Sequence, residues 1–130
     1  MGADLWVRRT DANNGYRIRV TSTFVTLYNL EEGNLSWLTL GSFYEDETVA
    51  VKIKVNGTSI KVWINGTSEI DTTDSTHGSG GVALTGAWTI FDNLKVGYDN
   101  NSDDDIDDAG DNVVIDEDFS STSFTVSYDP

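Results

Sequence analysis

The clearest pattern of hydrophobic and polar positions is a pair of alternating runs at residues 49–55 and 60–64. A period of two is that of a strand with one buried and one solvated face. Asn56 and Gly57 stand between the runs, and both tolerate the positive φ that a tight hairpin turn demands. Asn65-Gly66 repeats this device after the second run. The pattern therefore predicts a β-hairpin whose register is fixed, because a one-residue slip would bury its lysines.

Shorter alternating runs occur along most of the remaining chain, at a spacing of roughly ten residues. They predict strands at residues 5–8, 16–20, 24–30, 35–40, 82–84 and 88–98. Turn-forming Asn, Asp, Glu and Gly separate many of them, and residues 71–81 are predicted to form a loop. No gap is long enough for a crossover helix, which excludes a parallel α/β fold. The sequence thus predicts an all-β protein, an antiparallel β-sandwich with almost no helix.

Length and charge narrow the class of protein further. A chain of 130 residues can bury one sizeable core without cysteine, and it has none. No apolar run is long enough to indicate a membrane span, and no signal peptide is expected. The net charge is −14, and ten of the acids fall within residues 99–118, where there is no Lys or Arg. Such a surface repels phosphate, so nucleic acid and anionic lipid are not expected as partners, and cations are favoured.

Several short motifs follow one another in an order typical of one family. They are Asn14-Gly15-Tyr16-Arg17, Leu27-Tyr28, Val55-Asn56-Gly57-Thr58, Val62-Trp63-Ile64-Asn65-Gly66, residues 74–84 and Phe91-Asp92-Asn93-Leu94-Lys95-Val96. With these motifs the chain resembles, over residues 3–98, the concanavalin A-like, laminin-G-like jelly-roll modules of bacterial surface and secreted proteins. The resemblance implies two packed antiparallel sheets, a non-catalytic role in glycan binding or adhesion, a structural calcium ion, and an extracellular or cell-surface location.

The C-terminal residues extend this resemblance. Family modules begin with an Asp-Asp-Phe-Ser strand that pairs with the Phe-Asp-Asn strand, whereas here a similar sequence stands at residues 116–121. We therefore predict a strand at residues 119–127, with Phe119 buried beside residues 91–96. The last seven residues, 124–130, resemble the entry to a tyrosine-aspartate repeat of the RHS type, which implies a larger multidomain chain.

These assignments give a single domain in three parts. They are a sandwich body at residues 1–98, an acidic calcium-binding-like loop at residues 99–112, and a closing C-terminal strand at residues 113–130.

The acidic run carries oxygen donors at alternate positions. They are Asp99, Asn101, Asp103, Asp105 and Asp107. Looped calcium sites of the EF-hand or dockerin kind present hard oxygen ligands in this way. The sixth position is Asp104 instead of Gly and the twelfth is Gly110 instead of an acid, so a full EF-hand loop is not expected. A solvated acidic linker is the alternative interpretation.

One further acid is a calcium candidate on the resemblance alone. The family places its structural calcium near the position of Asp92, and a turn-capping role is the alternative.

Candidates for catalysis are few. A glycosidase needs two carboxylates across a cleft, and Glu45, Asp46 and Glu47 come nearest, at a strand entry where acids are commonly solvated. His77 is the sole histidine, in a loop of Ser, Thr and Gly, and no cysteine exists to form a triad with it. The sequence therefore predicts a protein that is not an enzyme.

The alternation also predicts which aromatic rings face solvent. Trp63 and Trp6 both stand between apolar neighbours that must point into the core, which leaves the two indoles outside. Arg8, Arg17 and Arg19 are expected to supply hydrogen-bond donors on the side of Trp6. Since a sugar site combines an apolar platform with convergent polar groups, Trp63, Trp6, Arg17 and Arg19 are the candidate carbohydrate site. The alternative is that the outer face is covered, in which case the module is a structural spacer that binds only calcium.

Overall fold

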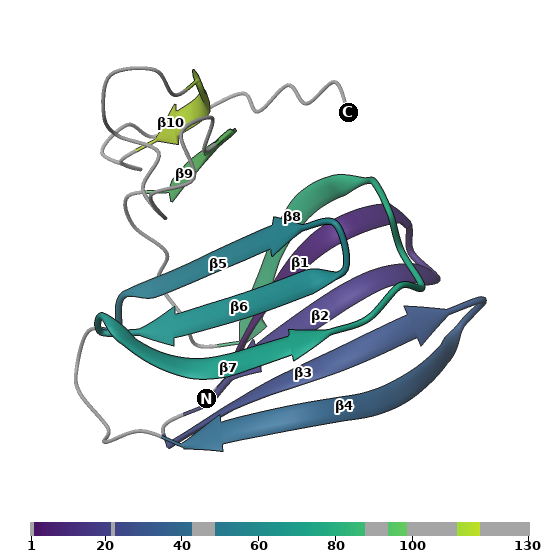
Figure 1. Ribbon diagram of the computed structural model, residues 1–130, viewed down its shortest axis with the longest axis horizontal. Helices are drawn as coiled ribbons and strands as arrows, with labels where there is room; N and C mark the ends of the chain where they lie inside the picture. The colour runs from purple at the N-terminus through teal and green to yellow at the C-terminus, as the bar shows by residue number, and fades with distance from the viewer. Residues whose placement is uncertain (1, 22, 43–48, 88–93, 99–111, 118–130) are drawn as a thin grey trace. The chain divides into compact units, whose positions relative to one another are not determined.

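The computed structural model describes residues 2–21, 23–42, 49–87, 94–98 and 112–117 (Figure 1). The chain divides into two compact units, Met1–Thr89 and Ile90–Asp129. Every described element is a β-strand, which confirms the all-β prediction. Within the described ranges, no helix is long and apolar enough to cross a membrane.

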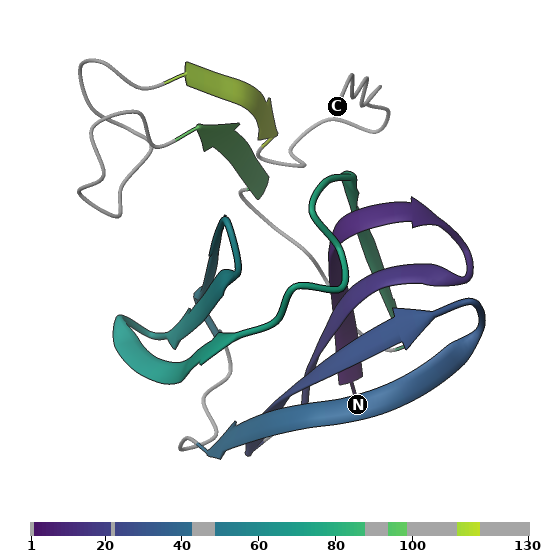
Figure 2. The same cartoon turned by 45° about the vertical axis from the view of Figure 1, so that its right-hand side comes forward.

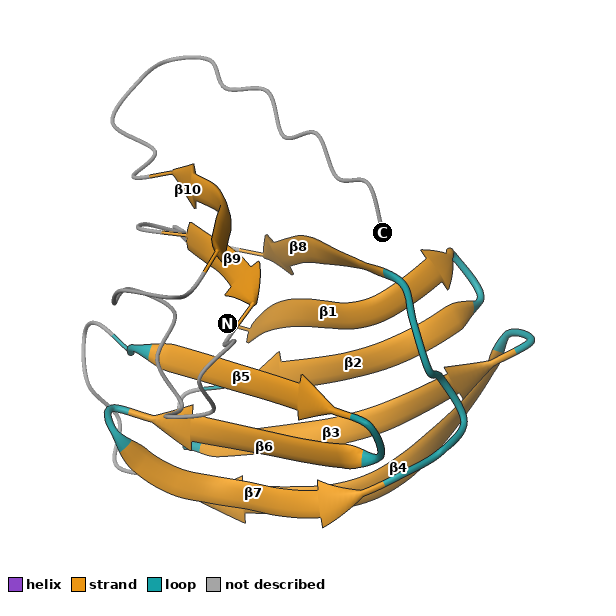
Figure 3. Cartoon of the chain, turned by 45° about the horizontal axis from the view of Figure 1, so that its top comes forward, coloured by secondary structure: helices purple, strands orange, loops and turns teal. Residues whose placement is uncertain are grey.

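Five strands of the first unit form an antiparallel sheet in the order β4-β3-β2-β1-β8 (Figure 3). The strands are β1 (Gly2–Asp11), β2 (Asn14–Val20), β3 (Phe24–Glu31), β4 (Asn34–Ser42) and β8 (Gly81–Ala87). Hairpins link β1 through β4, so strands that follow one another in sequence are neighbours in the sheet. The strands predicted in these parts of the chain are present, and each is longer than predicted.

The other three strands of this unit form a second antiparallel sheet, in the order β5-β6-β7. They are β5 (Val51–Asn56), β6 (Ser59–Ile64) and β7 (Thr67–Thr73). Figures 1 and 2 show this sheet against one face of the five-stranded sheet, with the chain after β7 crossing over to β8. Because β7 takes in Asp71 to Thr73, the predicted loop begins three residues later than expected.

The core lies between the two sheets and consists of the inward residues of each alternation. It comprises Val7, Tyr16, Ile18, Val20, Val25 and Leu27 from the larger sheet and Ile60, Val62, Ile64 and Ile70 from the smaller one. Burial of each large apolar side chain stabilises the fold by roughly 1.5–3 kcal/mol. Lys52 is exposed and Val62 is fully buried, so the register predicted for the β5–β6 hairpin is the one that forms.

The hairpin turns differ in one detail from the sequence prediction. Glu32-Gly33 and Asn65-Gly66 have positive φ at both residues, as expected of type I′ turns. In the β5–β6 turn, however, Asn56 pairs with Ser59, and only Gly57 has positive φ, at 57°. Positive φ at the first central residue alone is typical of type II′, so the prediction that Asn56 shares this conformation is wrong.

A bulge at Arg8 connects β1 to the opposite sheet. Arg8 has a φ of 49°, and the register of β1 shifts across this residue against both of its neighbours. Arg8 Nη1 donates hydrogen bonds to the carbonyl oxygens of Gly57 and His77. The side chain therefore holds the β5–β6 turn and the loop before β8 to the five-stranded sheet. The prediction that Arg8 supplies donors on the side of Trp6 is wrong, because the bulge turns its side chain toward the opposite sheet.

Buried polar groups fix the loop between β7 and β8. The Tyr16 hydroxyl is fully buried and donates to Asp74 Oδ1 at 2.6 Å, while the backbone N–H of His77 donates to the same hydroxyl oxygen at 3.2 Å. His77 Nε2 lies 2.7 Å from Asn29 Oδ1, and Asn29 Nδ2 donates to Thr76 Oγ1. The buried side chains of Tyr16, Asn29 and His77 thus each have a hydrogen-bond partner in this loop network, which removes the cost of burying them unpaired.

The second unit contains one described strand pair, β9 (Leu94–Tyr98) and β10 (Asn112–Glu117). The two strands are antiparallel, with Val113 opposite Gly97 and Glu117 opposite Leu94. The C-terminal segment therefore pairs with the strand that follows Asn93. The predicted strand at residues 119–127, with Phe119, lies outside the described residues and stays a prediction, as does the closing role of residues 113–130.

Replacement of Gly80 tests the close approach at the bulge. Gly80 has a φ of 143°, and a Cβ built there would lie 2.3 Å from the carbonyl carbon of Arg8. We expect Gly80→Ala to lower the free energy of unfolding by about 1–3 kcal/mol or more in urea titrations. An alanine disfavours this φ, and its Cβ would clash with the backbone of Arg8. Gly78→Ala, in the same loop with nothing near its Cβ, is the control and should cost far less. Equal losses in the two variants would contradict this account.

Alkaline stability tests the buried hydroxyl. Burial, together with the hydrogen bond to Asp74, raises the pKa of Tyr16 to about 12. A group whose pKa is raised by folding contributes stability below its unfolded pKa near 10, and this is lost as pH rises through the folded pKa. We expect the free energy of unfolding of the wild type to fall between pH 10 and about 12, and to fall by more than that of Tyr16→Phe. Tyr28→Phe, with Tyr16 intact, should keep the wild-type loss; parallel curves for all three proteins would refute the prediction.

Candidate functional site

A row of aromatic and cationic side chains crosses the outer face of the five-stranded sheet. Trp6 of β1 pairs with Arg17 of β2, Arg17 with Tyr28 of β3, and Tyr28 with Trp37 of β4. Paired residues on neighbouring strands share a face, so these four side chains lie side by side. They alternate with Val7, Ile18 and Leu27, which are in the core. The row is therefore on the face that points away from the smaller sheet.

The guanidinium groups of this face lie over its rings. The Cζ atom of Arg17 is 4.6 Å from the centre of the Tyr28 ring and 5.9 Å from that of Trp6. Arg9, which follows the bulge in β1, places its Cζ 5.4 Å from the centre of the Trp6 ring. Cation–π attraction of this kind is worth about 0.5–1 kcal/mol at exposed sites and more when water is excluded. The stacking holds Arg9 and Arg17 in position.

Trp37, at the open end of the row, is the most exposed ring of the described residues. Its exposed fraction is 60%, and Phe24, Leu35 and Leu40, elsewhere on β3 and β4, are 47–49% exposed. β4 is the edge strand, so no further strand follows Trp37 in this sheet. An indole that stays open to water on a sheet edge is a platform for an apolar surface such as the face of a sugar ring.

A bidentate ion pair stands next to the row. Arg19 donates from Nε and Nη2 to the two oxygens of Asp4, each at 2.8 Å. Hydrogen bonding to Asp4 raises the pKa of Arg19, so the guanidinium keeps its charge throughout the physiological range. Arg17 Nε also approaches Asp4, but at 4.0 Å it makes no hydrogen bond. Both oxygens of the Asp4 carboxylate are thus hydrogen-bonded to Arg19.

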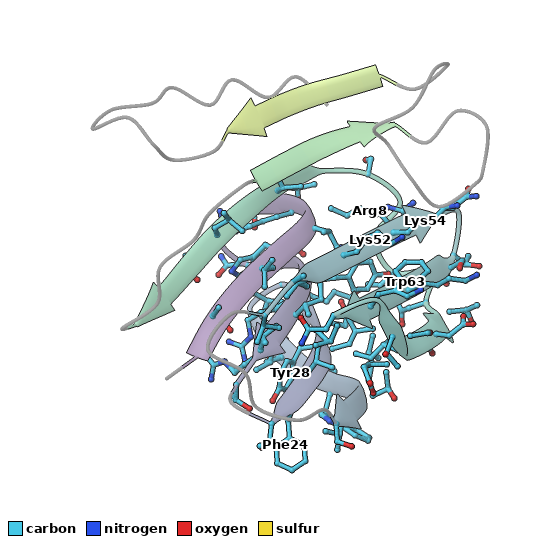
Figure 4. All side chains as sticks on the ribbon, turned by 90° about the vertical axis from the view of Figure 1, so that its left-hand side faces the viewer. Arg8, Phe24, Tyr28, Lys52, Lys54 and Trp63 are labelled. Carbon is cyan, nitrogen blue, oxygen red and sulfur yellow. The ribbon has the colours of Figure 1, made fainter. Side chains whose placement is uncertain are left out.

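The structure brings together only three of the four ligand residues expected from the sequence. Trp6, Arg17 and Arg19 lie on the outer face of the five-stranded sheet, as expected. Trp63 lies on β6, on the outer face of the other sheet, where Lys52 Nζ is 4.5 Å from the ring centre. Figure 4 shows Trp63 and Lys52 well apart from Tyr28 and Phe24. Because the core separates the two outer faces, Trp63 cannot share a site with the other three.

Sequence reasoning missed Tyr28, Trp37 and Arg9. Residues 35–40 contain apolar side chains at both odd and even positions, so alternation does not say which of them face solvent. The structure resolves this with a bulge, in which the register passes from Thr39 directly to Trp37 and leaves Leu38 as the extra residue. Leu38 packs against the core while Trp37 points outward. The pair Leu27-Tyr28 could have identified Tyr28 as a site residue. If Leu27 is buried, Tyr28 points to the outer face, where the pairing of β2 with β3 puts it beside Arg17.

The other candidate residues are placed as follows. Asp92, Asp99, Asn101, Asp103, Asp105 and Asp107 lie outside the described residues, so the calcium site stays a prediction. Glu45, Asp46 and Glu47 also lie outside them. In the part of the chain that is described, no three acidic or histidine side chains come together as metal ligands would. His77 is 9% exposed and is engaged with Asn29 in the loop network.

Comparisons with known proteins give one similar structure. No family model and no curated protein matches the sequence. A solved structure of a carbohydrate-binding module, CBM66, from Bacillus subtilis is similar to this chain with a TM-score of 0.59 and 25% sequence identity. The similarity covers 64% of this chain and 55% of the module's chain. It supports the β-sandwich class predicted from the sequence, whereas the concanavalin A-like assignment and the RHS context remain predictions.

Proposed function

We propose that this chain binds carbohydrate through the outer face of its five-stranded sheet, which we call the aromatic face and define by Trp6, Arg17, Tyr28 and Trp37. The observation that carries the proposal is the cross-strand row itself, with an open indole at one end and fixed guanidinium groups beside it. Sugar sites combine an apolar ring platform with a few oriented hydrogen-bond donors, and the aromatic face offers both. The similarity to a carbohydrate-binding module supports this function.

Binding without catalysis is the form of this function that we favour. The described carboxylates of the aromatic face are both engaged: Arg19 holds the two oxygens of Asp4, and Asp11 at the end of β1 accepts hydrogen bonds from its own turn. A glycosidase needs one carboxyl group free to donate a proton and a second to act as base or nucleophile. We infer that the chain serves as a binding or adhesive module within a larger extracellular bacterial protein.

Calcium stabilisation is the second part of the proposal. The donors at residues 99–107 are all oxygen atoms, the ligand type that calcium prefers, and their clustered charge favours a divalent cation. A structural spacer that binds calcium alone is the competing function, and the tests below separate it from a carbohydrate-binding module.

Saccharide retention tests the aromatic face. We expect the wild type to be retarded in affinity electrophoresis through a polysaccharide identified on a glycan array, and Trp37→Ala to lose this retardation because the stacking platform is gone. The variant should stay within about 1 kcal/mol of wild-type stability, since Trp37 is mostly exposed. Trp63→Ala is the matched control and should keep the retardation. A wild type that binds no saccharide, or a loss confined to Trp63→Ala, would refute the proposed site.

Metal removal tests the calcium proposal. Binding to the folded state alone stabilises a protein by about 2.7 kcal/mol when free ligand is one hundred times its dissociation constant. We therefore expect EDTA to lower the melting temperature and calcium, but not magnesium, to restore it. Replacing Asp103 and Asp105 by Asn should abolish the calcium response, while Asp71→Asn on β7 should not. A melting temperature that changes with neither EDTA nor calcium would refute this part of the proposal.

A further inference from the structure

The aromatic face carries positive charge on a strongly acidic protein. Arg9, Arg17 and Arg19 all project from it, whereas Asp4 is the acid within the row. Asp11 lies at the end of β1, and hydrogen bonds from the turn after it lower its pKa, with a smaller contribution from Arg9. Even with both acids counted, the face has more positive than negative groups, while the whole chain has a net charge of −14. Charge of this sign is the feature of the face that most needs an explanation.

Among the described residues, no acid is hydrogen-bonded to Arg17 or Arg9, the other two cations of this face. The Nε atom of each is buried and has no hydrogen-bond partner there. Arg17 is only 17% exposed, so much of its side chain is withdrawn from water beside Tyr28. The N–H groups of such a cation therefore have few hydrogen-bond acceptors, either from water or from the described protein. Stacking on a ring uses the face of the guanidinium and leaves its edge, where the N–H groups point, for an anion.

Asp4 lies within ion-pair distance of Arg17 but makes no hydrogen bond with its Nε atom. Both of its oxygens accept short hydrogen bonds from Arg19, and its distance to Arg17 Nε is 4.0 Å. Asp4 is itself only 15% exposed, so its pairing with Arg19 is shielded from competing water. The ion pair therefore fixes one arginine and leaves the neighbouring one available.

We propose that the aromatic face recognises an acidic saccharide. Arg17 is the main ligand of its carboxylate or sulfate group and Arg9 the second, while Trp37 stacks on a sugar ring. This inference rests on the proposed function and specifies its ligand class. Carboxylates and sulfates match the planar fork of a guanidinium, and hydrogen bonds to charged groups are about twice as strong as neutral ones. The geometry favours an oligosaccharide over a single sugar, because three strand spacings, about 14 Å, separate the ends of the row.

The net charge of the chain does not oppose such a ligand at contact distance. Charges separated by more than about 8 Å are largely screened at physiological ionic strength. An anion seated beside Arg17 experiences the local arginines most strongly, and the partly buried position of Arg17 reduces screening there. The same argument predicts that salt weakens binding of an acidic saccharide more than binding of a neutral one.

The test is a glycan array that pairs each uronic, sialylated or sulfated saccharide with its carboxyl-reduced or desulfated counterpart. We expect the acidic member of the best pair to bind about tenfold or more tightly than its neutral counterpart, as one charge-assisted hydrogen-bond pair provides. Isothermal titration of that pair with Arg17→Gln should show the preference lost and the weaker neutral binding kept. Lys61→Gln removes a cation from the opposite sheet and is the matched control, which should keep the preference. Comparison of the sulfated pairs with the uronic pairs shows whether the protein recognises sulfate or carboxylate.

The outcomes separate this inference from the proposed function. Equal binding of acidic and neutral members, with loss in Trp37→Ala, would overturn the acidic ligand and leave carbohydrate binding intact. Binding of neither member would overturn both. If Arg17→Gln fails to fold by circular dichroism, Arg9→Gln and the salt dependence of the wild type decide in its place. An acidic preference that survives Arg9→Gln and does not weaken with salt would overturn the inference.

Discussion

The pairing register of β1, β2 and β3 is the constraint on which both the core and the aromatic face depend. Successive residues of a strand point to opposite faces, so a single choice of register places Ile18 in the core and Arg17 outside. The same choice aligns Trp6, Arg17 and Tyr28 in one row. A slip by one residue would bury two arginines and expose the valine and isoleucine of β2. The hydrophobic effect that stabilises the sandwich therefore also assembles the site.

The bulge at Arg8 adds a second function to the same strand. Without it, β1 would continue its alternation, and Arg8 would not be free to reach the carbonyl oxygens of Gly57 and His77. The bulge also returns Arg9 to the outer side, where it lies over Trp6. One local irregularity thus ties the two sheets together at their edge and supplies the second cation of the aromatic face.

Much of the fold followed from the sequence because alternation and turn chemistry are local signals. The hairpin of β5 and β6, the strands of the larger sheet and the outward position of Trp6, Arg17 and Arg19 are all local inferences of this kind. Trp37 could not be found in this way, because the bulge at Leu38 interrupts the alternation of β4. Which sheet carries Trp63 is a question of topology, and topology depends on contacts between residues distant in sequence. The hydrogen bonds that join Tyr16, Asp74 and His77 are likewise long-range, so no local pattern indicated that His77 anchors a loop.

We expect carbohydrate to contact the row of side chains on the five-stranded sheet. An NMR titration that follows the indole N–H signals of Trp37, Trp6 and Trp63 tests this, because the first two lie on one outer face of the sandwich and Trp63 lies on the other. Addition of a saccharide that binds should shift the signals of Trp37 and Trp6 and leave that of Trp63 unchanged. A titration in which Trp63 shifts while Trp37 and Trp6 do not would contradict the account.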